Sequence, residues 1–327
     1  MNTMKKIVCS CLACGLMLLS GCGGQQDSKQ NKTAEITSKS DMTQAVPEAY
    51  KKAAKPQGTV VRLDYDSLDY ARNKAKIQKT AYVYLPYGYD EKDTETRYDI
   101  VYLMHSWGGH AGEYFDFTPT KNVFDNLIAN GDIPPVIIVS ATFYNRNSNT
   151  DFSGSIEELR AFHQDFENHL MPTVEGRYHT YAENTTSEGL AAARDHRIFG
   201  GFSLGSVTTW LEFCYDTDYI RYFLPMSGSC WYYGTYGDFQ FEKNVDFIEN
   251  LVKEKKLDER GYFIYHAVGT EDAVKYESEE MASEMLSRAT FTPDHYVFYQ
   301  KEGGLHDFNA VQEYLYNALP VFFCGDR

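Results

Sequence analysis

From Thr59 onward, short apolar runs alternate with amphipathic stretches. Two early runs, 60–65 and 79–85, alternate residue by residue and predict antiparallel edge strands. The run at 98–104 is almost continuously apolar, which is typical of a central strand covered on both faces. Further predicted elements are strands at 136–141, 197–199, 222–228, 262–268 and 295–299, and helices at 123–130, 156–174, 206–213, 244–255 and 310–319. This order predicts a mostly parallel, doubly wound α/β sheet with helices on both faces, in a single catalytic domain.

The amino-terminal end has a different pattern. Two lysines precede an apolar run, 7–19, that is too short to span a bilayer as a mature helix. The run ends in Leu-Ser-Gly-Cys22, which is typical of the lipobox of bacterial lipoproteins. We therefore predict a lipoprotein signal peptide over 1–21 and a lipid on Cys22. A plain secretory signal with a chance cysteine is the alternative.

Residues 22–56 are rich in Gln, Lys, Ser, Thr and Asp, and this composition predicts a flexible tether. The folded domain is expected to occupy 57–327. Together with the leader, this predicts an exported, surface-exposed protein that contacts the cell-envelope membrane only through its lipid anchor. The sequence does not indicate an oligomeric state.

Charge and cysteine content narrow the functional classes. The formal charge of −15 argues against nucleic-acid binding, because phosphates would be repelled. Beyond the leader and Cys22 the cysteines are Cys214, Cys230 and Cys324, an odd number without metal-ligand spacing. One disulfide among them or free thiols are both open. No histidine pair or carboxylate cluster has ligand spacing, so we expect neither a metal nor a cofactor.

The run 200–205, Gly-Gly-Phe-Ser-Leu-Gly, carries the most specific chemistry. Gly201, Ser203 and Gly205 form a G-x-S-x-G motif between a predicted strand and a predicted helix, which is the nucleophile elbow of α/β-hydrolases. The turn is so tight that only small residues fit two positions on either side of the serine. The serine hydroxyl then stands at the positive end of the following helix.

Two later loops also follow predicted strands. One, 269–272, contains Asp272, and the other, 302–308, contains His306 between a glycine pair and the last helix. The order serine, acid, histidine is that of α/β-hydrolases. We predict Ser203 as nucleophile, His306 as general base and acid, and Asp272 as the group that orients the imidazole. Glu271 is the rival for the acid, and Asp307 is expected to cap the last helix.

An oxyanion hole needs two backbone N–H groups. One is predicted from Leu204, directly after the nucleophile, and the other from the loop after strand 98–104, with Trp107 as the expected donor. Hydrolases usually have His-Gly in that loop, whereas this chain has His105-Ser106. The register of the second donor is therefore open by one residue.

Several separated motifs resemble bacterial feruloyl esterases, above all the esterase domains attached to cellulosomal xylanases, within the esterase D-like group of carbohydrate esterases. The motifs are MHSWGG at 104–109, ARDHR at 193–197, GGFSLGSVTTW at 200–210 and PMSGSCWYYG at 225–234. The resemblance implies removal of ferulate or related hydroxycinnamates from feruloylated xylan or arabinoxylan oligosaccharides, with Ser203, Asp272 and His306 as the triad. It also places Trp231 near the acyl pocket.

Aromatic side chains suit a planar aromatic acid, so Trp231, Tyr232 and His105 are predicted to bind substrate. The alternative for Trp231 is packing in the core. Acetyl-xylan esterases, thioesterases and siderophore esterases share the fold and triad, and a ring-sized acyl pocket would distinguish this chain from an acetyl esterase. A glycan-binding lipoprotein without catalysis belongs to another class, but such proteins usually lack a triad member, and all three are present.

Overall fold

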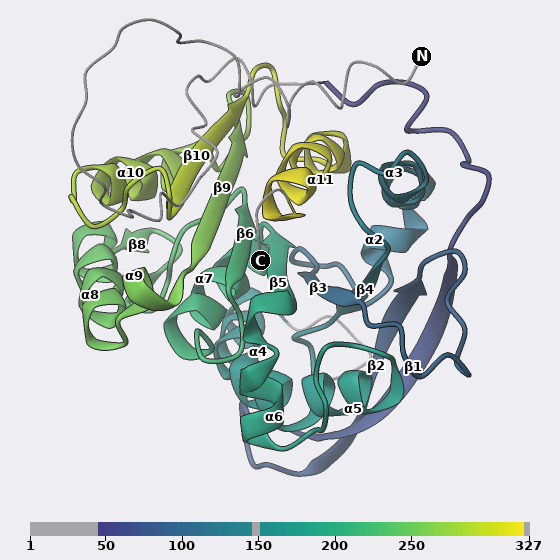
Figure 1. Ribbon diagram of the computed structural model, residues 1–327. Helices are drawn as coiled ribbons and strands as arrows, with labels where there is room; N and C mark the ends of the chain where they lie inside the picture. The colour runs from purple at the N-terminus through teal and green to yellow at the C-terminus, as the bar shows by residue number, and fades with distance from the viewer. Residues whose placement is uncertain (1–44, 146–150, 324–327) are drawn as a thin grey trace, which may run out of the picture.

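The computed structural model describes residues 45–145 and 151–323. Its centre is a twisted sheet of eight strands in the order β1-β2-β4-β3-β5-β6-β9-β10 (Figure 1). The strands are β1 (Thr59–Leu68), β2 (Lys76–Leu85), β3 (Asp99–Met104), β4 (Val136–Ala141), β5 (Arg197–Phe202), β6 (Tyr222–Met226), β9 (Phe263–Gly269) and β10 (Tyr296–Lys301). β2 pairs antiparallel with β1 and β4, and the remaining pairs are parallel. The mostly parallel, doubly wound sheet that the hydrophobic pattern predicts is confirmed, as is the α/β-hydrolase fold that the elbow motif and the loop order predict.

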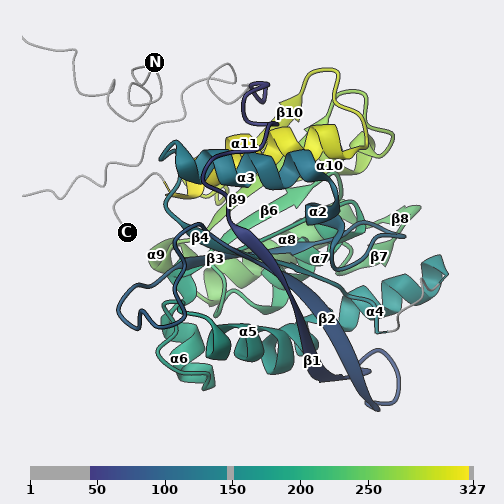
Figure 2. The ribbon, with the colours of Figure 1, turned by 90° about the vertical axis from the view of Figure 1, so that its right-hand side faces the viewer.

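Helices cover both faces of the sheet (Figure 2). One face packs against α4 (Phe152–Asp165), α5 (Met171–Arg177), α6 (Ser187–Ala192), α7 (Leu204–Tyr215), α8 (Phe241–Glu254), α9 (Leu257–Arg260) and α10 (Lys275–Leu286). The other packs against α2 (Glu113–Asp116), α3 (Thr118–Ala129) and α11 (Phe308–Phe323). In the part of the chain that the structure describes, no helix is both long and apolar enough to cross a membrane.

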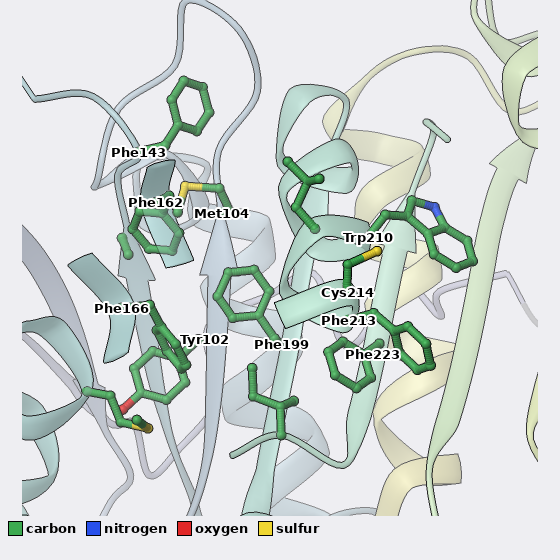
Figure 3. Packing of buried hydrophobic residues seen from close by; sticks show 14 of the residues in the cluster. Tyr102, Met104, Phe143, Phe162, Phe166, Phe199, Trp210, Phe213, Cys214 and Phe223 are labelled. Atoms are coloured by element: carbon green, nitrogen blue, oxygen red, sulfur yellow. The ribbon is translucent and has the colours of Figure 1, made fainter. Parts of the chain in front are cut away.

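The core beneath α7 is dominated by aromatic rings (Figure 3). The Phe166 ring meets Tyr102 edge-on at 5.0 Å between centroids and Phe199 at 5.6 Å. Burying each such ring stabilises the fold by roughly 1.5–3 kcal/mol. Because α7 is buried from Leu204 to Cys214, the start of this helix is held rigidly at the end of β5.

Several boundaries differ from the sequence prediction. The helix expected over 156–174 begins at Phe152, passes through a π-helical turn at Phe166–Leu170 and restarts as α5, where Pro172 lies in the first turn. Proline has no N–H to donate to the preceding turn, and it lies where the chain changes from the π-helical turn to α5. The helix α10 was not predicted, because its charged sequence has little apolar periodicity. β2 is not an edge strand, since it lies between β1 and β4.

The predicted tether is too long at its carboxyl end. Val46, Tyr50 and Ala54 are buried, and the first two belong to the hydrophobic cluster that contains α3 and α11. The Tyr50 hydroxyl donates to Asp132 at 2.5 Å, and the Asn126 side chain donates to the Lys52 carbonyl at 2.8 Å. The apolar side chains of Val46, Tyr50 and Ala54 recur every four residues in an otherwise polar stretch, and their burial is the reason why this segment packs on the domain. The signal peptide, Cys22 and most of the tether lie outside the described residues.

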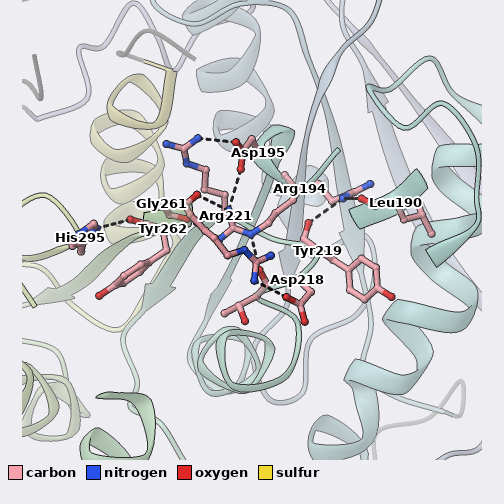
Figure 4. A network of polar contacts seen from close by, with 12 residues as sticks. Leu190, Arg194, Asp195, Asp218, Tyr219, Arg221, Gly261, Tyr262 and His295 are labelled. Atoms are coloured by element: carbon pink, nitrogen blue, oxygen red, sulfur yellow. Dashed lines mark hydrogen bonds and ion pairs between the residues drawn. The ribbon is translucent and has the colours of Figure 1, made fainter. Parts of the chain in front are cut away.

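A polar network fixes the amino ends of β5, β6 and β9 (Figure 4). Arg194 is buried and donates to the carbonyls of Thr217 at 2.6 Å and Gly261 at 2.7 Å. Burial lowers the pKa of Arg194 to about 10, which leaves it charged at neutral pH. These contacts stabilise the amino ends of the strands. The loops at the carboxyl ends of the same strands are where active sites of such sheets lie.

Two of the three candidate disulfide cysteines lie side by side. Cys214, near the end of α7, and Cys230 are buried free thiols with 3.9 Å between their sulfur atoms. Cys324 lies outside the described residues. The only cysteine pair that the described chain brings into contact is therefore Cys214 with Cys230.

Candidate active site

Ser203 occupies the tight turn between β5 and α7. Its backbone has φ 60° and ψ −116°, a conformation that a non-glycine residue adopts only under strain. A Cβ on Gly201 would lie 2.3 Å from the Gly205 carbonyl oxygen, and a Cβ on Gly205 would lie 2.1 Å from the Met104 carbonyl oxygen. Both contacts are with backbone, so the glycines at these positions are a steric requirement of the turn.

Ser203, His306 and Asp272 form one hydrogen-bonded chain. The Ser203 hydroxyl lies 3.0 Å from His306 Nε2 and can donate to it. His306 Nδ1 lies 2.9 and 3.0 Å from the two Asp272 carboxylate oxygens. This geometry matches that of a nucleophile, a base and an orienting acid. The structure thus brings together the three residues that the sequence order singled out.

Close backbone contact holds the acid loop against the histidine loop. A Cβ on Gly269 would lie 2.1 Å from the Gly304 carbonyl oxygen, and that oxygen accepts from Glu271 N–H at 3.0 Å. The Glu271 side chain is exposed, so Asp272 is the residue that reaches the histidine. Asp307 accepts from Ala310 N–H at 3.0 Å and caps α11, as predicted.

Asp272 is maintained as a carboxylate. Burial alone would raise its pKa, but hydrogen bonds from His306 and from the Val274 N–H at 2.8 Å outweigh that effect and hold the pKa below its ordinary value. A negative Asp272 fixes the proton on Nδ1 of His306. That leaves Nε2 as the acceptor for the serine proton.

The loop after β3 lies over the start of α7. Ser106 donates its backbone N–H to Glu113 at 3.0 Å and its hydroxyl to the same carboxylate at 3.1 Å. Gly108 N–H donates to the Tyr144 hydroxyl at 3.0 Å, and Gly109 N–H donates to the Ser106 carbonyl at 3.1 Å. Trp107 N–H has no acceptor among the described residues. It is therefore free to donate to a substrate oxygen.

His105 was predicted to bind substrate, and the structure contradicts this. The ring is fully buried between Phe143 and Tyr144, and its two nitrogens contact the Ser106 carbonyl and the Thr142 hydroxyl, both at 2.7 Å. Burial lowers the pKa of His105 to about 3, so the ring is neutral. His105 therefore stabilises the loop after β3 through these hydrogen bonds and ring contacts.

An aromatic cluster starts at Trp107, in the loop after β3 whose backbone lies against Gly205 of the elbow. We define it by its five residues: Trp107, Phe152, Trp231, Tyr236 and Phe239. Phe152 meets the Trp107 ring edge-on at 5.5 Å and the Tyr236 ring at 5.9 Å, and Trp231 lies 6.3–6.5 Å from three other rings of the cluster. Trp107 and Tyr236 are 53% and 59% exposed, whereas Trp231 is 3% exposed. The cluster therefore has an open surface with Trp231 as its floor.

Tyr232, in contrast, lies away from the site. Its ring stacks on Phe247 at 4.0 Å and contacts Tyr215 at 5.6 Å. Tyr215 ends α7, about 18 Å along the helix axis from Ser203 at 1.5 Å per residue. The prediction of Tyr232 as a substrate-binding residue was wrong, because the chain bends at Tyr232 and turns its side chain to Phe247, away from the cluster that Trp231 joins.

Sequence reasoning missed other residues around the site: Glu113, Phe152, Tyr236, Phe239 and Glu277. Tyr236 could have been found, because Gly234 and Gly237 flank it and predict the hairpin of β7 (Gly234–Thr235) and β8 (Asp238–Phe239). Glu277 gave no signal, because its helix was not predicted. Among the described residues, no group of three or more His, Cys, Asp or Glu side chains is arranged to hold a metal ion.

Proteins and a protein family that are similar to this chain agree with this geometry. The model of the Esterase family, described as "Putative esterase", matches residues 73–319. Endo-1,4-beta-xylanase Y of Acetivibrio thermocellus is 33% identical over 285 residues, which are 85% of this chain and 24% of that protein. Endo-1,4-beta-xylanase/feruloyl esterase of Xylanibacter ruminicola is 29% identical over 73% of this chain and 28% of its own length. The chain thus spans about a quarter of these curated relatives.

A solved structure covers more of both chains. A serine-to-alanine mutant of the feruloyl esterase module from Clostridium thermocellum, complexed with sinapinate, superposes with a TM-score of 0.74 at 32% identity. The match covers 86% of this chain and 93% of that one. The family match spans most of the described domain and includes all three residues of the hydrogen-bonded chain. This protein therefore belongs to the esterase family and has the α/β-hydrolase fold.

Proposed function

We propose that this protein is a serine esterase that hydrolyses feruloyl and related hydroxycinnamoyl esters on plant cell-wall arabinoxylan. The observation that carries the proposal is the adjacency of two features. The Ser203–His306–Asp272 chain supplies ester hydrolysis, and the aromatic cluster next to it supplies a surface for a planar aromatic acid. The relatives named as feruloyl esterases support the same substrate class.

The mechanism follows from the geometry. Ser203 Oγ attacks the ester carbonyl carbon while His306 Nε2 takes the hydroxyl proton. Asp272 stabilises the imidazolium that forms. The carbonyl oxygen becomes negative and accepts from the N–H groups of Leu204 and Trp107, of which the first is an unpaired amide at the start of α7. A donor in each loop lets the oxyanion sit between β3 and α7.

Three proton transfers, all through His306, complete the cycle: to the leaving alcohol, from the attacking water, and back to Ser203 Oγ. The tetrahedral intermediate collapses, the ester C–O bond breaks, and His306 returns the proton to the leaving alcohol of the sugar. The acyl group is then esterified to Ser203. Water enters, gives a proton to His306 and attacks the acyl carbon, and the collapse of the second intermediate releases the acid and restores the Ser203 hydroxyl.

The location of the protein is part of the proposal. The leader pattern and Cys22 support export and a lipid anchor on the cell envelope, with the catalytic domain facing plant polysaccharide. Because residues 46–54 pack on the domain, the tether would be shorter than the composition alone predicts.

The test compares methyl ferulate with an acetyl ester, using the purified protein and its Ser203→Ala variant. We expect ferulate cleavage that the variant loses. Acetyl cleavage without ferulate cleavage would retain Ser203 chemistry and replace the substrate with that of an acetyl-xylan esterase. Absence of turnover with both esters would contradict the proposed activity.

A further inference from the structure

Glu277 is a buried carboxyl group next to the aromatic cluster, and the mechanism does not use it. It lies in the first turn of α10, and the residue is 5% exposed. Its Oε2 atom accepts from the Trp231 indole Nε1 at 3.1 Å and from the Ser229 hydroxyl at 3.2 Å. Glu277 thus contacts the floor of the cluster through a single carboxylate oxygen.

The burial of this carboxyl group has a free-energy cost that requires a reason. Burial raises the pKa of Glu277 to about 7, although the bonds from Ser229 and Trp231 and the nearby His306 oppose the rise. The titratable groups that act on it are His306, which favours the carboxylate, and Asp272, which disfavours it. An apolar side chain would avoid this cost. What such a side chain could not do is accept a hydrogen bond from the indole.

Trp231 needs such an acceptor to keep one orientation. An indole has a single N–H donor, and a buried one usually finds a partner. The Trp231 main chain is anchored separately, because Arg160 donates to its carbonyl at 3.2 Å. The indole N–H is shared between Glu277 Oε2 and the Ser229 hydroxyl oxygen, each at 3.1 Å, and that hydroxyl in turn donates to Glu277 at 3.2 Å. With the backbone held by Arg160 and the indole edge held by Glu277 together with Ser229, the ring has a fixed plane. Phe152, Tyr236 and Phe239 then pack around that plane.

We propose that Glu277 is a positioning residue that fixes the Trp231 indole as the floor for the ring of an aromatic acyl group. This inference rests on the proposed function and deepens it. Glu277 makes the enzyme selective for aromatic over short acyl groups through Trp231, without contact with the reacting atoms. A short acyl group ends before the indole, so its hydrolysis does not depend on Glu277.

The first test measures kcat/KM for methyl ferulate and for 4-nitrophenyl acetate. Glu277→Leu removes the carboxylate that accepts from the indole and that orients the Ser229 hydroxyl, which leaves Ser229 as the one remaining partner of the indole N–H among the described residues. We expect ferulate hydrolysis to fall about tenfold or more, with acetate hydrolysis within about twofold of the wild type. Glu277→Gln keeps an acceptor oxygen and should restore most ferulate activity. Glu279→Gln is the matched control, because Glu279 lies on the same helix and its carboxylate accepts a hydrogen bond from the Gln300 side chain at 2.9 Å, outside the aromatic cluster.

A double-mutant cycle with Trp231→Phe isolates the bond itself. If Glu277 acts through the indole N–H, the losses in Glu277→Leu and Trp231→Phe are not additive. The indole proton gives a second readout by NMR. The Trp231 Nε1–H resonance, assigned by its loss in Trp231→Phe, should titrate near pH 7 in the wild type and not in Glu277→Gln.

The outcomes separate this inference from the proposed function. If the wild type does not cleave ferulate, the proposed function fails. If the wild type cleaves ferulate and Glu277→Leu leaves the ratio of ferulate to acetate activity unchanged, the inference fails alone. An equal loss with both esters would also overturn it, because Glu277 would then act on the Ser203–His306–Asp272 chain. Additive losses in the cycle would place its effect elsewhere than on Trp231.

Discussion

The close backbone contact between Gly269 and Gly304 predicts how much activity a substitution at Gly269 would remove. Gly269 ends β9, three residues before Asp272, and Gly304 precedes His306 by two residues. In Gly269→Ala the new Cβ would lie 2.1 Å from the Gly304 carbonyl oxygen and 2.4 Å from its carbon. Both neighbours are backbone atoms, so no side chain can rotate away. The two loops must separate.

The size of the separation gives the expected loss of activity. Ordinary contact with a Cβ begins at 3.4 Å, so the backbones must move apart by about 1.3 Å. His306 would move relative to both Asp272 and Ser203, and its 3.0 Å contact with the serine would lengthen. A misplacement of about 1 Å costs on the order of 100-fold in rate. We therefore expect kcat to fall about 100-fold while the fold survives.

The assay is steady-state hydrolysis of methyl ferulate and 4-nitrophenyl acetate, with circular dichroism to check folding. Both esters should lose kcat alike, since both need His306. The control is Gly131→Ala in the loop after α3, where φ is +73° and nothing lies within 4 Å of the new Cβ. It should lower stability by about 1 kcal/mol and leave kcat unchanged. A folded Gly269→Ala variant with kcat near that of the wild type would refute the reasoning.

Three further predictions concern groups around the site and the core. Glu212 is fully buried beside Asp216, and burial raises the pKa of both carboxyl groups, that of Glu212 to about 7. Wild-type stability therefore falls as pH rises from 4 to 8, and Glu212→Gln should gain stability relative to wild type over that range; an equal difference at both pH values in urea unfolding would contradict this. Tyr50→Ala should destabilise the domain by about 3 kcal/mol without changing kcat. An unchanged melting temperature would instead support a tether that extends to residue 56. Glu113→Ala frees Ser106 and loosens the Trp107 loop, so kcat should fall about tenfold for ferulate and acetate alike, and a loss with ferulate alone would argue against an oxyanion role.

The sequence was most informative where a local pattern has one steric solution. The elbow around Ser203 and the order of the three loops could be predicted, because parallel strands place their carboxyl ends on one edge of the sheet. The pairing of Asp272 rather than Glu271 with His306 agreed with the more common residue, but only the loop register in the structure selects it.

Side-chain direction in irregular segments could not be predicted. Trp231 and Tyr232 are adjacent in sequence, yet the first faces the aromatic cluster and the second stacks on Phe247. His105 is of a residue type that is common in active sites and lies in a loop next to the elbow, yet its side chain is fully buried. Glu277 was missed because α10 is mostly polar, with a small apolar stripe that periodicity does not reveal.

The central claim is that Ser203 carries the aromatic acyl group during turnover. The direct test mixes the protein with methyl ferulate, quenches the reaction with acid within one turnover, and maps the peptides by mass spectrometry. We expect a feruloyl group on the peptide that contains Ser203, and none on that peptide in Ser203→Ala. A modification on another residue, or ferulate release in Ser203→Ala at the wild-type rate, would contradict the account.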